Sequence, residues 1–296
     1  MTASTAQDQT NVATAVVKNI SHIATLPEIT LKIIELVEDP SSTAQDLHNI
    51  IANDPALCSR ILKVVNSAFY GLPRQIGSIN RAIVLLGLNA VKNIAIAASL
   101  AKLFRGGELC SKFSARDLWI HSIATGTAGK LIADELKLGL PDEAFLAGLI
   151  HDIGIMVEMQ AERLKLVEVF ETLELDGDGT PKQDMRELET KVFGTNHEVF
   201  GAALCETWKF PRSFSYVAGH HHDPQSLPDN SRTLAWVVHV ADRISGTLKL
   251  GFRCDLRDTS PNPAALDALK LSLASVEGIK SMLPKAIEEV EATFGT

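Results

Sequence analysis

A histidine followed by an aspartate, His151-Asp152, stands inside an otherwise apolar run, AFLAGLIHDIGIMVEM. Burying two polar side chains costs free energy unless each finds a hydrogen-bonding partner or a metal ion. A hydrogen-bonded core pair would explain the two residues when they are considered alone. The pair therefore predicts either a polar contact in the core or two ligands of a metal site.

Further histidines and aspartates stand at the edges or inside other apolar, helix-like segments, and seven of the nine histidines fall between His121 and His239. Asp117 and His121 are four residues apart, so their side chains face the same way on a helix. Asp242 follows His239 in the apolar run LAWVVHVADRIS. The full set of candidates is Asp117, His121, His151, Asp152, His197, His221, His222 and Asp242.

Each candidate also has a structural explanation. Asp117 fits the third position of a helix capping box, Asp242 fits a cap or a salt bridge, and His197 fits a polar helix start. The triple histidine at 220–222 fits a solvated loop in which at most two rings face inward. Taken together, imidazoles and carboxylates suit iron, manganese, zinc or nickel. Several histidines with bridging carboxylates are what a two-metal hydrolytic site needs.

The most polar loop, LELDGDGTPKQD, also contains oxygen ligands. Glu174, Asp176, Asp178 and Gly179 match positions 1, 3, 5 and 6 of a calcium-binding EF-hand loop, but Met185 stands where a bidentate glutamate is needed. We therefore expect a solvated turn here.

Helices account for nearly the whole pattern, because apolar residues recur at spacings of three and four. Asp54-Pro55 is typical of a helix start, and Ser42 with Gln45 resembles a capping box. The tail from Asn262 to Phe294 is expected to form two helices. These signals predict an all-α protein of helices roughly 8 to 20 residues long, joined by short connections.

The glycine pair Gly106-Gly107 is the best candidate for a domain boundary. It would divide an N-terminal helical lobe, residues 1–107, from a second lobe, residues 108–296. All the candidate ligands fall in the second lobe.

Composition narrows the classes of function. The net charge of −8 argues against general binding to DNA or anionic lipid, because both need a basic surface. Four cysteines lie far apart, and the N-terminus has no basic segment followed by an apolar run. We therefore expect a cytoplasmic protein with reduced cysteines that does not span a membrane.

The candidate ligands, in their order, resemble those of the HD superfamily of metal-dependent phosphohydrolases, and the N-terminal half resembles an HDOD module. The motifs that carry the resemblance are LPEITLKIIEL, NDPALCSRILKVVNSAFYG, SINRAIVLLGLNAVKNIAIA and NHEVFGAALCETWKFP followed by AGHHHDP. The resemblance covers residues 20 to 250. It implies a two-lobed all-α protein of bacterial signalling and regulation.

The resemblance also implies roles for individual residues. His121, His151, Asp152, His197, His221, His222 and Asp242 would be metal ligands, with Asp152 bridging two metals and orienting the attacking hydroxide. Asp117 falls where the related HD-GYP enzymes, which hydrolyse cyclic di-GMP, place a carboxylate ligand. The implied cofactor is a dinuclear centre of divalent metal, iron ahead of manganese. We align His221 and His222 because Asp223-Pro224 follows them, although His220 could replace either one.

Two departures from the HD-GYP pattern affect the expected function. Ile155 replaces a lysine that helps to hold phosphate, and HHDPQSLPDN stands where a Gly-Tyr-Pro loop is expected. These losses favour a regulatory protein that is non-catalytic or weakly catalytic, with a signalling partner docked on the N-terminal lobe near Asn66 and Tyr70. The alternative is a phosphohydrolase or phosphodiesterase for a cyclic dinucleotide or another phosphoester, with Lys130, Arg163, Lys165 or Arg243 supplying positive charge.

Overall fold

The computed structural model describes residues 5–20, 26–39, 41–67, 69–104 and 107–294. The helices that precede residue 105 are α1 (Ala6–Asn19), α2 (Glu28–Glu38), α3 (Ala44–Ala52), α4 (Pro55–Val65), α5 (Ile79–Leu86), α6 (Leu88–Leu100) and the short 3-10 helix η1 (Ala101–Phe104). The two strands are β1 (Glu108–Cys110) and β2 (Phe113–Ser114), which pair as an antiparallel hairpin.

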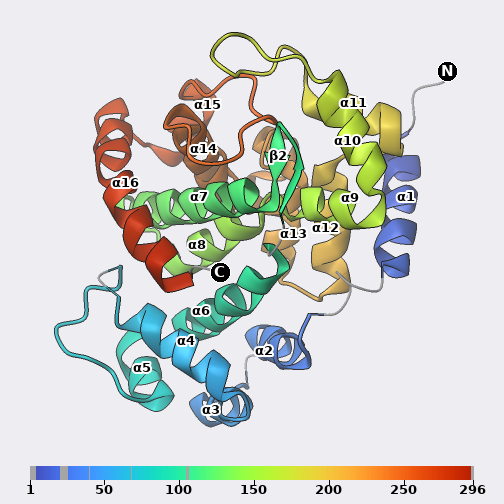
Figure 1. The fold of residues 1–296 in the computed structure, drawn as a ribbon. Coiled ribbons are helices and arrows are strands. Elements are labelled where there is room, and N and C mark those ends of the chain that lie inside the picture. Colours follow the sequence, from blue (N-terminus) through green and yellow to red (C-terminus); the bar gives the residue numbers. More distant parts are fainter. Residues whose placement is uncertain (1–4, 21–25, 40, 68, 105–106, 295–296) are drawn as a thin grey trace.

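The remaining helices form the larger part of the molecule (Figure 1). They are α7 (Ala115–Glu135), α8 (Pro141–Ile150), α9 (Ile153–Ala161), α10 (Arg163–Thr172), α11 (Met185–Phe193), α12 (His197–Thr207), α13 (Arg212–His220), η2 (Pro224–Ser226), η3 (Asp229–Ser231), α14 (Thr233–Thr247), α15 (Pro263–Leu269) and α16 (Leu273–Phe294). The all-α prediction is confirmed, and the two expected helices of the C-terminal tail are α15 and α16.

Most of the predicted helix starts carry the expected cap. The carboxylate of Asp54 accepts the backbone N–H of Leu57, with Pro55 as the first helical residue of α4. The predicted box from Ser42 to Gln45 was wrong by one residue, because Thr43 and Asp46 exchange the two capping hydrogen bonds instead. The side chain of Ser42 bonds elsewhere, to the carbonyl of Leu36.

The polar loop before α11 closes on itself. The Oδ1 atom of Asp176 accepts the backbone N–H groups of Asp178 and Thr180, both at 2.9 Å. Leu175 and Pro181 form an isolated antiparallel bridge across the loop. Since side-chain-to-backbone bonds of this kind are typical of turns, the loop has the geometry of the solvated turn we expected.

Helix α7 is the centre of the fold, and α8, α14 and α16 pack against it (Figure 1). Helices α2 to α6 lie together on one side of the molecule, where α6 contacts α8. Helix α1 instead packs against α12, and α16 reaches back to α4. Buried apolar residues form one continuous core from Ala13 to Phe294. Gly106, in the predicted boundary, lies outside the described residues, and the division at residue 107 stays a prediction.

One segment, Pro141–Ala161, is long and apolar enough to cross a membrane by length and composition alone. It comprises α8, α9 and the turn between them, and most of it is buried inside the protein. A buried core helix passes the same test, so this is weak evidence for a membrane span.

Candidate metal centre

Five segments of the chain bring imidazoles and carboxylates together in the interior. They are the second turn of α7, the turn between α8 and α9, the start of α12, the end of α13 and the middle of α14, and they supply His121, His151, Asp152, His197, His221, His222 and Asp242. The side chain of His222 is 8% exposed, and those of the other six residues are at most 1% exposed.

The break between α8 and α9 positions the central pair. Helix α8 ends at Ile150 and α9 begins at Ile153, so His151 and Asp152 occupy the turn between two buried helices. Gly154 allows α9 to approach α12 closely, because a Cβ atom there would lie 1.8 Å from the carbonyl oxygen of His197. This contact sets His197 beside Asp152.

Asp152 stands between two groups of histidines. Its Oδ1 atom lies 3.2 Å from Nε2 of His221 and 3.9 Å from Nε2 of His197. Its Oδ2 atom lies 3.2 Å from Nε2 of His151 and 3.8 Å from Nε2 of His121. One carboxylate therefore faces two potential metal positions, each with its own pair of imidazole nitrogens.

Other side chains complete the two positions. The Oδ1 atom of Asp242 lies 3.0 Å from Nε2 of His121 and 3.7 Å from Nε2 of His151.

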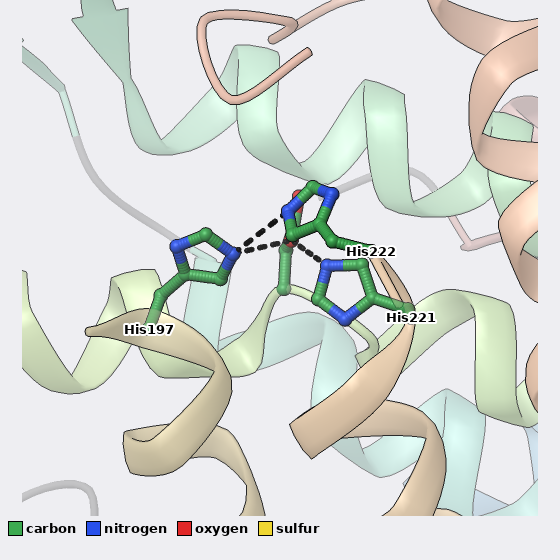
Figure 2. Close-up of side chains that lie close together, drawn as sticks. His197, His221 and His222 are labelled. Carbon is green, nitrogen blue, oxygen red and sulfur yellow. Dashed lines mark hydrogen bonds and ion pairs between the residues drawn. The ribbon is translucent and has the colours of Figure 1, made fainter. Parts of the chain in front are cut away.

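On the other side of Asp152, the Nε2 atoms of His197 and His222 are 3.1 Å apart. Figure 2 shows His197, His221 and His222 converging from two helices on a common point.

The donor atoms of this cluster fit a metal ion better than they fit one another. His151 Nε2, His221 Nε2, Asp242 Oδ1 and both oxygens of Asp152 are buried and have no hydrogen-bond partner among the described residues. Unsatisfied polar atoms in a core cost about 1–3 kcal/mol each. Nitrogen and oxygen donors bind zinc at about 2.0–2.2 Å, so neighbouring donors roughly 3 Å apart can share one ion. The cluster could thus hold metal ions.

In three of the histidines, the ring nitrogen that points away from the centre has a hydrogen-bond partner. Nδ1 of His197 donates to Glu189 at 2.8 Å, and Nδ1 of His151 donates to the carbonyl of Gly148 at 2.7 Å. Nδ1 of His221 faces the carbonyl of Val217 at 3.2 Å. With the proton on Nδ1, Nε2 keeps a free lone pair that points toward the centre. Histidines that bind metals usually donate their other ring N–H to a carboxylate or carbonyl in this way.

The buried histidines and carboxylates of the centre shift one another's pKa values. Burial disfavours a charged His197, but Glu189 and Asp152 outweigh it and raise its pKa to about 9. Burial likewise opposes charge on Asp152, yet His151 and His221 lower the pKa of that carboxyl well below its usual range. Without a metal, protons on His151 and His197, whose pKa values are raised, balance charge on the buried carboxylates. A metal cation would replace these protons.

The sequence of this chain matches the model of the HDOD domain over residues 23–224. That match covers well over half of the chain. The chain belongs to the HDOD family.

Relatives of this HDOD protein share its fold. The structure of an HDOD domain protein of unknown function from Geobacter sulfurreducens is 23% identical and matches with a TM-score of 0.81, covering 99% of this chain and all of that one. A Shewanella amazonensis protein with the provisional name of a phosphohydrolase is 21% identical, with a TM-score of 0.69, and covers 95% of this chain and 98% of that one. At these identities the likeness shows the fold alone.

Two further relatives are longer than this HDOD protein. An uncharacterized protein of Treponema pallidum (strain Nichols) is 24% identical over 237 residues, or 79% of this chain, which spans only 44% of that relative's length. A Marinobacter aquaeolei VT8 protein, provisionally named for signal transduction, is 20% identical with a TM-score of 0.76, covering 98% of this chain and 65% of that one.

The structure does not bring Asp117 into the centre. Its side chain is exposed, and it accepts a hydrogen bond from the hydroxyl of Ser114 at 2.7 Å. The backbone N–H of Asp117 donates back to Ser114, which caps α7. The capping alternative therefore describes this residue, because the cap turns its carboxylate away from the face that carries His121.

The structure selects two rings from the triple histidine. His221 and His222 face the cluster, whereas Nδ1 of His220 lies 2.9 Å from the hydroxyl of Ser226 in a more exposed position. His239 lies behind the cluster, where its Nδ1 donates to the carbonyl of His221 at 2.7 Å. Its burial and the nearby Arg243 lower its pKa to about 4, which keeps the ring neutral.

Sequence reasoning missed two acidic residues of this region. Glu189 holds His197 from α11, and Asp255 lies with His222 and Asp242 in a group whose ligand atoms are all within 4.8 Å of one another. In the sequence, Asp255 stands between Cys254 and Leu256 in a loop with several other charged residues, and no pattern marks it as a ligand.

Proposed function

We propose that this HDOD protein is a signalling or regulatory protein that keeps an HD-type metal centre and uses it for structure or sensing, with little or no turnover. The observation that carries the proposal is Asp152, whose two oxygens each face a separate pair of buried histidines. His121, His151 and Asp242 would hold one metal and His197, His221 and His222 the other, with Asp152 shared between them.

The closure of the centre supports a regulatory role. The histidines and aspartates of the centre lie in the core, and the most exposed, His222, shows 8% of its side chain. Ile155, which replaces the phosphate-binding lysine of the HD-GYP pattern, is fully buried in α9. A phosphoester would therefore meet neither an open face nor a cation at that position.

Three of the four cations suggested for phosphate binding, Lys130, Lys165 and Arg243, are committed to other contacts. Lys130 pairs with Asp134 at 3.1 Å, and Lys165 pairs with Glu162 at 2.7 Å. Arg163 is exposed at the start of α10. The Nε of Arg243 donates to His239, and its guanidinium also donates to the carbonyl of Ser260.

The test is elemental analysis of protein purified without air or chelator, with Asp152→Ala beside it. We expect about two iron or manganese ions per chain, as in two-metal sites, and little or no metal in the variant. Metal binding at 100 times Kd would stabilise the wild type by about 2.7 kcal/mol, and the variant would lose this gain. Unchanged metal content and melting temperature in Asp152→Ala would contradict the proposal.

A metal-dependent phosphohydrolase is the second candidate, because the retained histidines and the shared Asp152 suit it. Bound metals would supply a hydroxide nucleophile and polarise the phosphate. The metal-loaded protein should be screened against phosphodiesters, cyclic di-GMP first. Our proposal expects at most slow hydrolysis above that of Asp152→Ala, and fast turnover that disappears in this variant would establish the second candidate.

We further propose that the N-terminal lobe docks a signalling protein. Asn66 and Tyr70 are poor contact residues for it, since Asn66 bonds to the backbone of Ile76 and the Tyr70 hydroxyl lies 2.9 Å from Asp142. On α5, Val84 and Leu85 are 75% and 47% exposed, and these apolar side chains are better candidates for the contact.

A further inference from the structure

The segment that follows α14 returns across the start of α7. The backbone N–H of Phe252 donates to the carbonyl of Asp117 at 3.0 Å. Gly251 has a positive φ of 73°, and a Cβ atom there would lie 2.3 Å from the same carbonyl oxygen. Only glycine fits both the backbone angle and the close approach. The path of this segment is therefore fixed, and it directs Asp255 toward the buried cluster.

Asp255 is a buried carboxylate without a partner. Its side chain is 0% exposed, and neither of its oxygens has a hydrogen bond within the described part of the chain. Its Oδ2 atom lies 3.6 Å from Nε2 of His222. An unpaired acidic group is costly in such a place, and a cation would remove the cost.

We propose that Asp255 is a metal ligand on the His222 side of the centre. This proposal rests on the metal centre proposed above. It would supply the extra carboxylate that the HD-GYP pattern assigns to position 117. In this chain Asp117 is exposed and bonded to Ser114, whereas Asp255 is enclosed beside His222 and Asp242. The carboxylate would thus come from a loop rather than from the helix that carries His121.

The competing explanation is a protonated aspartate that only fills space in the core. Asparagine distinguishes the two roles, because it keeps the shape of a protonated carboxyl but is a poor metal ligand. Asp117→Asn is a matched control, since it makes the same chemical change at the position expected from the family pattern.

The experiment compares the wild type, Asp255→Asn and Asp117→Asn after metal removal and titration with Mn²⁺. Bound metal is measured by elemental analysis and thermal unfolding. Loss of an outer-shell partner costs 10–100-fold in metal affinity, so loss of a direct ligand should weaken the His222 position at least about 100-fold. The metal content of Asp255→Asn should then fall from about two ions to about one, and Asp117→Asn should match the wild type.

The metal-free proteins provide a second measurement. Asp255→Asn should melt no lower than the wild type without metal, because it replaces an unpartnered buried carboxyl with a neutral group of the same shape. Asp255→Ser gives the same metal comparison if the asparagine variant does not fold. Two ions in the wild type and also in the Asp255 variants would overturn the ligand role and leave the metal centre intact. A wild type that binds no Mn²⁺ or iron would overturn both proposals.

Discussion

Lys92 in the N-terminal part and the side chains around Asp152 are buried in opposite ways. In the N-terminal part, Lys92 is 2% exposed, and its ammonium donates to the carbonyl of Leu36 at 2.5 Å and to the hydroxyl of Ser42 at 2.7 Å. Around Asp152, by contrast, several donor atoms converge without hydrogen bonds among the described residues. Buried polar groups in a folded protein are usually hydrogen-bonded, whereas unsatisfied donor atoms that face one another could hold a metal ion.

The largest expected effect is the pH dependence of the free energy of unfolding of the metal-free protein. The pKa of His197 is raised from its usual 6.5 to about 9, so its protonated form stabilises the fold below pH 6.5. This contribution, up to about 3 kcal/mol at 1.36 kcal/mol per pKa unit, is lost as the pH rises from 6.5 to 9. Chemical denaturation across this window measures it.

A variant and the metal sharpen that test. Glu189→Gln removes the main group that raises the pKa of His197, so its metal-free stability should vary less across the window. An unchanged pH profile in this variant would break the assignment. Added Mn²⁺ should stabilise the wild type more at pH 9 than at pH 6.5, since metals bind deprotonated imidazoles.

Lys92→Met tests the satisfied site. It should lower the free energy of unfolding by about 1–3 kcal/mol, because the acceptors of the ammonium lose their donor, and leave the metal content unchanged. Lys32→Met is the matched control, since Lys32 is 54% exposed and should change stability by less than about 0.5 kcal/mol. Loss of metal in Lys92→Met would show that the two regions are not independent.

Ser114→Ala is expected to have the smallest effect. Removing this cap of α7 should cost about 1 kcal/mol, and Thr43→Ala should cost as much at the equivalent cap of α3. Urea denaturation measures both losses. Neither variant should lose metal, and a lower metal content in Ser114→Ala alone would bring Asp117 back as a contributor to the centre.

The comparison also shows what could be predicted from the sequence. Apolar spacing and caps were enough for the all-α fold, since both are local. The order of His121, His151, His197 and Asp242 was enough to find residues that the fold brings together. For Asp117 the sequence left two roles open, because an acidic residue one turn before a histidine fits a cap as well as a ligand. The hydrogen bond to Ser114 shows the cap.

Other parts of the site depended on packing that the sequence does not display. Asp255 approaches only because the segment after α14 crosses the start of α7. Glu189 reaches His197 from α11 across a short connection. The alternatives at 220–222 were decided by the end of α13, which leaves His220 near Ser226 and turns the next two rings inward.

The five separate segments that converge on Asp152 also bear on how fast the protein unfolds. A metal bound by His121, Asp152 and Asp242 would cross-link α7, the turn before α9 and α14. Such cross-links hold together segments that lie far apart in the sequence. The native state would then have to release its metal before these helices separate. Bound metal would therefore slow unfolding as well as raise the free energy of unfolding.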